Sequence, residues 1–283
     1  MTVWDIIVAL ILGFVEGLTE FAPVSSTGHM IIVDDMLLKS QEILGSPEVA
    51  NTFKVVIQLG SILAVVIVFW KKLWSLVGIH IGGKDTNVTS GPRLKLSHVI
   101  VGLLPAAVLG LAFEDIIDQY LFRVETVLLA LVAGAVLMII ADWKAKQNKE
   151  SDGASLDEVT YKQAILIGLF QCIALWPGFS RSGATISGGV LMGLKHRAAA
   201  DFTFIMAVPI MFGASAVSLI SKWDVMTAEV IPFFVVGFVS AFVFAWISIR
   251  FFLVLIEKIK LLPFAIYRIV LAAILGVIYI SMM

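Results

Sequence analysis

Charged residues are scarce in this chain. Only 14% of its 283 residues are Asp, Glu, Lys or Arg, whereas 60% are hydrophobic, and the mean hydropathy is +1.01. Soluble globular domains use about 25% charged and roughly 45–50% apolar residues. The composition therefore excludes an ordinary soluble domain and predicts an integral membrane protein that is surrounded by membrane lipids.

The sequence also has little cysteine, little net charge and no recognisable leader. The single cysteine, Cys172, cannot form an intramolecular disulfide and gives no support for redox chemistry. A net charge of -1 gives no reason to expect a nucleic-acid partner. The N-terminus lacks the basic region and small-residue cleavage site of a signal peptide, so we expect it to be part of the mature protein.

Six apolar segments are long enough to cross a bilayer, whose hydrocarbon core needs about 20 helical residues. They are 53–70, 97–113, 124–142, 202–220, 231–256 and 263–282. Two further apolar regions, 4–38 and 161–193, are interrupted near their middles by the polar stretches APVSSTGH (22–29) and WPGFSRSGAT (176–185). Non-helical backbone at membrane depth is tolerated only inside protein or beside a polar cavity. We therefore predict two re-entrant helical hairpins.

The positions of Lys and Arg favour this topology. With both hairpins re-entrant, thirteen basic residues at the connections fall on one face and three on the other. If 161–193 crossed the membrane once, the split would be ten against six. Two full crossings per hairpin would give the same split as re-entry, but the short half-helices argue against them. The positive-inside rule then predicts that both termini lie outside the cytoplasm.

The two interrupted regions are copies of each other. A shift of 155 residues aligns Gly13 with Gly168 and the stretch 25–28 (SSTG) with 180–183 (SRSG), and a weaker shift of 135 aligns 101–102 with 236–237. We predict an all-α polytopic membrane protein with a single domain over 1–283. Its inverted repeat halves, at about 1–142 and 161–283, would bring both loops together near mid-membrane.

Each loop precedes a second half-helix, which we expect to begin near Gly28 in one hairpin and near Gly183 in the other. Ser and Thr residues before these positions can act as N-caps. Helix N-termini carry unpaired backbone N–H groups and the positive end of the helix dipole, and phosphate is their usual ligand. The arrangement indicates an anion-binding site.

Glu16 and Glu20 lie four residues apart, which places both carboxylates on one helix face. In an apolar medium two such neighbours cannot both stay ionised unless a cation lies between them or one is protonated. The pair therefore predicts either a divalent-cation site or one acid–base group beside a structural acid. The alternative is a pair of acids at the membrane interface, but acids inside membranes are costly and usually functional.

His29 directly follows a run of hydroxyl residues and lies within one loop of the two acids. It is a candidate general acid, general base or phosphate donor, and the alternative is a polar residue whose hydrogen bonds are simply satisfied. Arg181, between Ser180 and Ser182, can bind phosphate oxygens through two N–H groups. The alternative for Arg181 is a salt bridge to Glu20 that only joins the hairpins.

Other residues of the loops and spans have weaker signals. Gly178 and Gly183 allow the backbone to approach a ligand closely, and Thr185 offers a further hydroxyl or a helix cap. Lys54 and Gln58 are candidates for lining the cavity. Arg250 and Arg268 lie near span ends, where we expect their side chains to extend to the membrane surface.

The motifs Glu16-x-x-x-Glu20, PVSSTGH (23–29) and PGFSRSGAT (177–185) closely resemble those of the bacterial undecaprenyl-diphosphate phosphatase family of the bacitracin-resistance type. The resemblance covers essentially the whole chain. It implies a hydrolase that removes the terminal phosphate of the C55 polyprenyl diphosphate and recycles the lipid carrier for cell-wall synthesis. It also implies a bacterial plasma (inner) membrane location, a site facing the exterior, and a divalent cation, Mg²⁺ or Ca²⁺.

The resemblance further implies roles for individual residues. Glu16 and Glu20 would be metal ligands or acid–base groups, and Ser26 and His29 would be a nucleophile and its base. Arg181 would hold the diphosphate. We expect the substrate-binding set to comprise Ser25, Thr27, Gly178, Ser180, Ser182, Gly183 and Thr185. The residues leave open whether Ser26 or a water molecule attacks, and they are compatible with a homo-oligomer.

The main rival interpretation is a transporter or flippase for lipids or anions, because inverted repeats with broken helices are typical of transporters. A carrier needs a binding site, but it does not need a cluster of Ser, His and paired acids. An intramembrane metalloprotease is weakly indicated because the sequence has no His-Glu-x-x-His motif.

Overall fold

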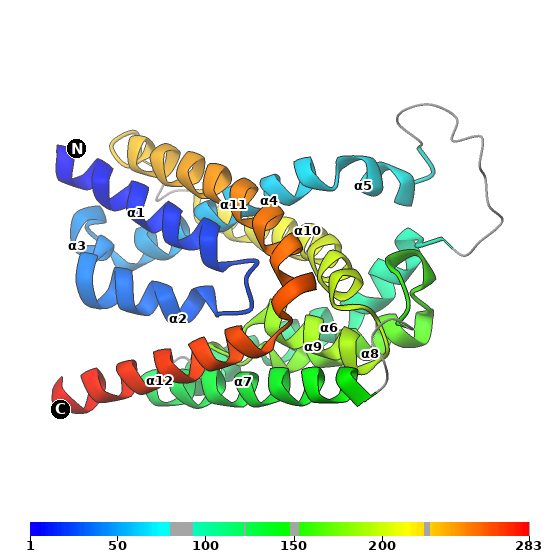
Figure 1. Ribbon diagram of the computed structural model, residues 1–283. Coiled ribbons are helices and arrows are strands. Elements are labelled where there is room, and N and C mark those ends of the chain that lie inside the picture. The colour runs from blue at the N-terminus through cyan, green and yellow to red at the C-terminus, as the bar shows by residue number, and fades with distance from the viewer. Residues whose placement is uncertain (80–92, 122, 148–152, 224–226, 283) are drawn as a thin grey trace.

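The computed structural model describes residues 1–79, 93–121, 123–147, 153–223 and 227–282, and these residues are almost entirely helical (Figure 1). Within them there is no strand, only an isolated bridge between Ala154 and Leu194. Six of the described helices are long and apolar enough to cross a membrane. They are α4 (Pro47–Val68), α6 (Leu96–Leu121), α7 (Val124–Gln147), α10 (His196–Ser221), α11 (Ile231–Ile259) and α12 (Leu262–Met282). In α6 the part that meets this criterion is Leu96–Phe113. The predicted all-α class is confirmed, and each of the six predicted spans corresponds to one of these helices.

Two spans begin earlier than hydropathy predicts. α4 begins at Pro47 instead of residue 53, and α10 at His196 instead of residue 202. In α4 the Ser46 hydroxyl accepts a hydrogen bond from the Val49 N–H, and Pro47 occupies the first turn, where its missing N–H costs nothing. A hydropathy window cannot detect these polar first turns.

Each interrupted region forms a helical hairpin. In the first, α1 (Val3–Thr19) is followed by α2 (Ser26–Met30), which continues as the π-helix η1 (Ile31–Leu38); in the second, α8 (Tyr161–Ile173) is followed by α9 (Arg181–Leu191). Figure 1 shows α1 running from the N-terminus to the centre and the chain returning through α2. α1, α8 and α9 have 17, 13 and 11 residues, fewer than the roughly 20 needed to cross a bilayer. Re-entry into a membrane stays a prediction. The remaining short helices are α3 (Ser40–Leu44), α5 (Trp70–Leu76) and η3 (Leu156–Glu158).

The hairpins pack crosswise, each against a span of the other half of the chain. α1 packs on α11, and α8 packs on α6. A Cβ at Gly13 would lie 2.3 Å from the Gly237 carbonyl oxygen, and a Cβ at Gly168 would lie 2.2 Å from that of Gly102. These two contacts join the glycines that the shifts of 155 and 135 residues align. The halves are therefore intertwined, and their glycines let both hairpins approach the centre.

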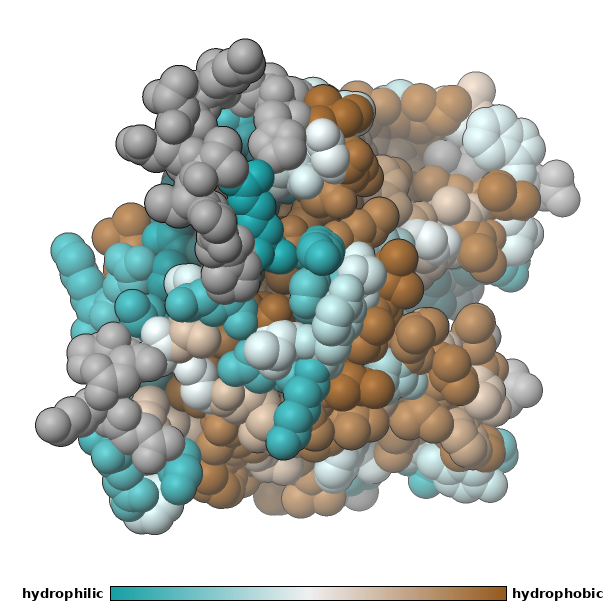
Figure 2. Space-filling view, turned by 90° about the vertical axis from the view of Figure 1, so that its right-hand side faces the viewer, coloured by the Kyte–Doolittle hydropathy of each residue, from teal (hydrophilic) through white to brown (hydrophobic). Residues whose placement is uncertain are grey.

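The largest hydrophobic core surrounds α10, whose Phe202, Phe204 and Met206 are fully buried. Both termini lie at one end of the helix bundle, and α5 and α8 lie at the opposite end (Figure 1). Figure 2 views that opposite end, where hydrophilic residues gather beside a hydrophobic flank. This arrangement places both termini on the same side, as an even number of crossings requires.

The Gly168 contact makes a prediction about stability. We expect Gly168→Ala to lower the free energy of unfolding by about 1–3 kcal/mol, because the new Cβ would overlap the Gly102 carbonyl group. Thermal unfolding in detergent measures this change. Gly213→Ala is the matched control, because Gly213 lies within α10 and a Cβ there meets nothing within 4 Å. Equal melting temperatures for the two variants would contradict the close packing of the hairpin.

Candidate active site

Both hairpin loops end on a serine with a left-handed backbone. Ser25 has φ 72° and ψ 96°, and Ser180 has φ 73° and ψ 115°. Each serine caps the helix that follows: the Ser25 hydroxyl accepts the Gly28 N–H at 3.2 Å, and the Ser180 hydroxyl accepts the Gly183 N–H at 3.1 Å. Non-glycine residues in such sparsely populated conformations cost about 1–3 kcal/mol and cluster at functional sites. The two loops therefore share one strained geometry.

These caps shift the starts of the half-helices. α2 begins at Ser26 and α9 at Arg181, each two residues before the predicted positions Gly28 and Gly183. The reason is that the first serine of each motif, and not a later hydroxyl, is the N-cap. As a consequence, Ser26 and Arg181 occupy equivalent positions in the first turns of α2 and α9, next to their loops.

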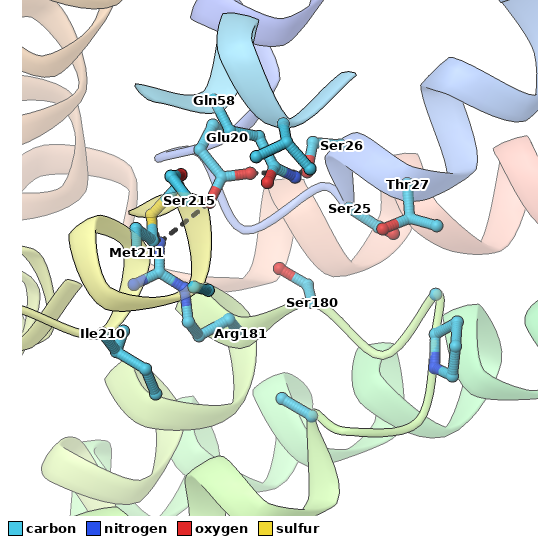
Figure 3. Close-up of a pocket in the computed structure, with 15 residues that line it drawn as sticks. Glu20, Ser25, Ser26, Thr27, Gln58, Ser180, Arg181, Ile210, Met211 and Ser215 are labelled. Atoms are coloured by element: carbon cyan, nitrogen blue, oxygen red, sulfur yellow. Dashed lines mark hydrogen bonds and ion pairs between the residues drawn. The ribbon is translucent and has the colours of Figure 1, made fainter. Parts of the chain in front are cut away.

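Glu20 connects the two loops (Figure 3). Its Oε1 accepts a hydrogen bond from Arg181 Nη2 at 2.8 Å, and its Oε2 accepts one from the Ser26 hydroxyl at 2.6 Å. The Ser182 hydroxyl adds a bond to the Ala22 carbonyl oxygen at 3.1 Å. The side chains of Arg181 and Glu20 are only 19% and 9% exposed. The predicted alternative for Arg181, an ion pair that joins the hairpins, is therefore present.

A cavity of about 290 Å³ lies between the loops. α4 and α10 complete its wall. The lining residues are Glu20, Ser25, Ser26, Thr27, Val55, Gln58, Ala174, Pro177, Gly178, Ser180, Arg181, Ile210, Met211, Ala214 and Ser215. Arg181 Nη1 is buried and has no hydrogen-bond partner among the residues that the structure describes. Buried donors normally have a partner, so this nitrogen is available to an anion in the cavity.

Seven of the predicted site residues line this cavity: Glu20, Ser25, Ser26, Thr27, Gly178, Ser180 and Arg181. Five others, Glu16, His29, Ser182, Gly183 and Thr185, do not appear in its lining. Thr185 is fully buried; its hydroxyl donates to the Arg181 carbonyl oxygen at 2.8 Å and accepts from the Thr203 hydroxyl at 2.9 Å. In this structure the Thr185 hydroxyl stabilises the first turn of α9 and does not face the cavity.

The predicted pair of Ser26 and His29 is not formed. His29 Nδ1 lies 2.7 Å from the Ser25 carbonyl oxygen, and its Nε2 lies 2.6 Å from the Tyr267 hydroxyl. A carbonyl oxygen only accepts, so Nδ1 carries a proton, and in the neutral ring Nε2 accepts from Tyr267. Ser26 is instead paired with Glu20, because the turn at Ser25 directs its hydroxyl to that carboxylate.

Glu16 lies four residues before Glu20 and is buried. Its side chain interacts electrostatically with Glu20 and Arg181, and its Oε1 has no hydrogen-bond partner in the described part of the chain. The structure brings no group of three or more His, Cys, Asp or Glu side chains together within the described ranges. Mg²⁺ commonly takes one or two carboxylates and completes its shell with substrate phosphate and water. Glu16 and Glu20 fit such a donor set.

Among the residues with weaker sequence signals, Gln58 lies where it was expected, whereas Lys54 and Arg268 do not. Gln58 lines the cavity, whereas Lys54 forms ion pairs with Asp34 and Asp35. Arg250 is exposed and lies over the Trp246 ring. Arg268 does not extend to the membrane surface: it is 0% exposed and its Nη2 donates to the carbonyl oxygens of Ala130 and Gly178.

Met211 and Ser215 of α10 also line the cavity and were not anticipated from the sequence. They lie four residues apart, on one helix face, and Met211 Sδ accepts a hydrogen bond from Arg181 Nη2 at 3.2 Å. The sequence signal that could have indicated this wall of the cavity is Ser215, a polar residue inside an apolar span. Hydropathy alone does not distinguish a cavity-facing residue from one that faces lipid.

Sequence comparison assigns the family. The sequence model of the bacitracin resistance protein BacA family matches residues 9–274, which include both hairpin loops. The chain belongs to this family. Three similar relatives, each named undecaprenyl-diphosphatase, come from Anoxybacillus flavithermus (63% identical), Exiguobacterium sibiricum (62%) and Bacillus subtilis (61%). The alignments cover 99%, 98% and 97% of this chain, and 99%, 99% and 98% of the relatives. This member of the BacA family therefore matches these relatives over nearly their whole length.

The strained cap at Ser180 can be tested by comparing two substitutions. Ser180→Ala and Ser180→Gly both remove the acceptor of the Gly183 N–H, but only glycine relieves the positive φ. We expect Ser180→Gly to be more stable than Ser180→Ala by about 1 kcal/mol or more in thermal unfolding.

Ser46 provides the matched control, because it caps α4 with an ordinary extended backbone at φ -156°. Glycine already costs less than alanine at most N-caps, so the test is the difference between the two sites. An equal advantage of glycine over alanine at Ser46 and Ser180 would contradict backbone strain in the loop.

Proposed function

We propose that this chain hydrolyses undecaprenyl diphosphate to undecaprenyl phosphate and inorganic phosphate. The observation that carries the proposal is the chain of contacts from Ser26 through Glu20 to Arg181, which joins two loops around one cavity. A hydroxyl, a carboxylate and a guanidinium are the groups that phosphoryl transfer requires for attack, proton removal and charge stabilisation. The names of relatives that are 61–63% identical over nearly their whole length support the same substrate.

The diphosphate binds between the two loops. Its terminal phosphate accepts hydrogen bonds from Arg181 Nη1 and from backbone N–H groups in the first turn of α9. Because Arg181 Nη2 is already fixed on Glu20, the guanidinium needs little reordering when substrate enters. Such preorganised charge is the largest contribution to catalysis in many enzymes.

Ser26 is the nucleophile in this proposal. Glu20 Oε2 takes the hydroxyl proton while Ser26 Oγ forms a bond to the terminal phosphorus, and the bond from that phosphorus to the bridging oxygen breaks. Undecaprenyl phosphate leaves with the bridging oxygen. Water then attacks the phosphorus of the phosphoserine and the bond from phosphorus to Ser26 Oγ breaks. Glu20 returns its proton to Ser26 Oγ, and inorganic phosphate leaves with the two protons of the water. His29 contributes by holding the Ser25 carbonyl next to the nucleophile.

A divalent cation, Mg²⁺ or Ca²⁺, is part of the proposal, with Glu16 and Glu20 as its protein ligands. When bound, it would neutralise charge on the diphosphate oxygens. Glu16 Oε1 supports this assignment, because it is buried without a donor among the described residues and such an oxygen is costly.

The same proposal places the protein in the bacterial plasma membrane, with the site open toward the exterior. The first hairpin supports this orientation, because α1 runs to the centre from the end that holds both termini (Figure 1), and the basic connections predict that end to lie outside the cytoplasm. The apolar outer surfaces of the helices supply the environment for the prenyl tail.

Phosphate release from undecaprenyl diphosphate by the detergent-purified protein tests the reaction. We expect Glu20→Gln and Arg181→Ala each to lower kcat about 100-fold or more, because each removes a group that acts in the transition state. Glu48→Gln and Arg250→Ala are matched controls at exposed residues and should retain full turnover. Absence of turnover in the unsubstituted protein, together with labelled lipid crossing sealed vesicles, would favour a carrier instead.

The cation assignment makes a separate prediction. We expect a chelator to suppress phosphate release and added Mg²⁺ or Ca²⁺ to restore it. Glu16→Gln should then need about 10-fold more cation for half-maximal rate, since ligand changes commonly weaken metal affinity by at least this factor. A cation titration of phosphate release measures the shift. An unchanged titration curve for Glu16→Gln would remove this residue from the metal site.

A further inference from the structure

Two consecutive residues of α12, Tyr267 and Arg268, contact the two hairpins separately. None of the cavity-lining residues found in the described ranges comes from α12. Even so, the Tyr267 hydroxyl bonds His29 in the first hairpin, and the Arg268 guanidinium bonds Gly178 in the second. A single turn of one helix therefore reaches both halves of the site.

Arg268 contacts the backbone of the second loop. Its Nη2 donates to the Gly178 carbonyl oxygen at 3.0 Å and to the Ala130 carbonyl oxygen of α7 at 3.2 Å. A Cβ at Gly134 would lie 2.4 Å from Nη2, and a Cβ at Gly183 would lie 2.9 Å from Nη1. The guanidinium thus fills a space between α7 and the first turn of α9 that only glycines leave open.

The chemistry of Arg268 is unusual for a purely structural residue. Its side chain is completely buried, and its hydrogen bonds in the described part of the chain go to two carbonyl oxygens and the Met138 sulfur, not to a carboxylate. Its Nε is also buried without a hydrogen-bond partner in the described part of the chain. A buried cation without a counter-ion costs several kcal/mol, so its retention calls for a compensating role. An anionic substrate beside Gly178 would supply the missing negative charge.

Tyr267 fixes the first loop through His29. The rings of Tyr267 and His29 are nearly parallel, with an interplanar angle of 3° and centroids 5.7 Å apart, and the hydroxyl lies 2.6 Å from Nε2. The other ring nitrogen of His29 holds the Ser25 carbonyl oxygen at 2.7 Å. Ser25 precedes the proposed nucleophile Ser26 and carries the strained backbone. Tyr267 therefore acts on Ser26 through two hydrogen bonds.

We propose that Tyr267 and Arg268 are positioning residues that fix the two hairpin loops relative to each other, so that Ser26 and Arg181 face the same phosphate. Each residue orders one backbone carbonyl group of a loop: Tyr267 orders Ser25 by way of His29, and Arg268 orders Gly178 directly. Their adjacency in α12 sets the separation of the two loops. Misplacing reacting groups by about 1 Å can cost 100-fold in rate, so the relative position of the two loops matters for the proposed hydrolysis.

Amide hydrogen exchange without substrate tests the positioning role independently of the proposed function. We expect Arg268→Lys and Arg268→Met to speed exchange in the segment 176–183 about 10-fold or more while the segment 22–30 stays as in the unsubstituted protein. Tyr267→Phe should do the reverse. Tyr279→Phe is the matched control, because Tyr279 also lies in α12 and bonds a carboxylate, Glu125, away from both loops.

Kinetics supply the second measurement, and only this part rests on the proposed hydrolysis. We expect kcat for phosphate release to fall about 100-fold in Arg268→Met and about 10-fold in Tyr267→Phe, with a smaller change in KM. Arg268→Lys should recover part of the loss, since its ammonium group can still bond one carbonyl oxygen. Tyr279→Phe should keep the unsubstituted rate.

Three results would overturn the proposal. One is unchanged exchange in both loops of the Tyr267 and Arg268 variants. Another is faster exchange throughout the chain, which would show that these residues only stabilise the fold. The third is a loss of kcat that equals the loss of folded protein. If the unsubstituted protein released no phosphate at all, the proposed function would fail, and the exchange pattern alone would decide the positioning role.

Discussion

The ion pair between Glu20 and Arg181 is the interaction on which the rest of the site depends. It joins residues 161 positions apart in the sequence, one from each hairpin, at 2.8 Å. Both loops must reach the same depth for this contact to form. The glycine contacts between α1 and α11 and between α8 and α6 make that approach possible, and the serine caps direct Ser26 and Arg181 from their helices toward Glu20.

Burying these charges in an apolar protein costs free energy, and this cost limits which ligands the site can bind. Breaking a buried pair by removing one partner typically costs about 3–5 kcal/mol, because the remaining charge is left uncompensated. An additional buried cation, Arg268, nevertheless lies next to the site, and Arg181 Nη1 has no partner among the residues that the structure describes. Two arginines and two carboxylates surround the loops, and the buried guanidinium nitrogens that have no partner among the described residues, Arg181 Nη1 and Arg268 Nε, favour an anion. A diphosphate provides that charge, and the strained loops are the part of the structure that it would contact.

The sequence predicts the helices better than it predicts the contacts of the site. All six spans follow from apolar length, and the two interrupted regions follow from Pro, Gly, Ser and Thr within apolar runs. Capping of the half-helices by Ser or Thr was predicted, but the left-handed backbone of Ser25 and Ser180 could not be, because it contradicts local preference and is imposed by tertiary packing.

The errors around the site also have physical causes. Arg268 was expected at the membrane surface because it is near a span end, but glycines on α7 and α9 create a buried space for it. His29 was expected to pair with Ser26, yet Tyr267, 238 residues away in the sequence, binds its ring. Which face of an apolar helix meets the cavity depends on contacts between distant segments, and hydropathy carries no information about these.

The most direct test of a shared site is an experimental structure with a non-hydrolysable polyprenyl methylenediphosphonate. We predict that its terminal phosphonate lies in the cavity, with oxygens about 3 Å from Arg181 Nη1 and with its phosphorus facing Ser26 Oγ. A diphosphonate bound to only one hairpin, or bound outside the cavity between the loops, would contradict this account.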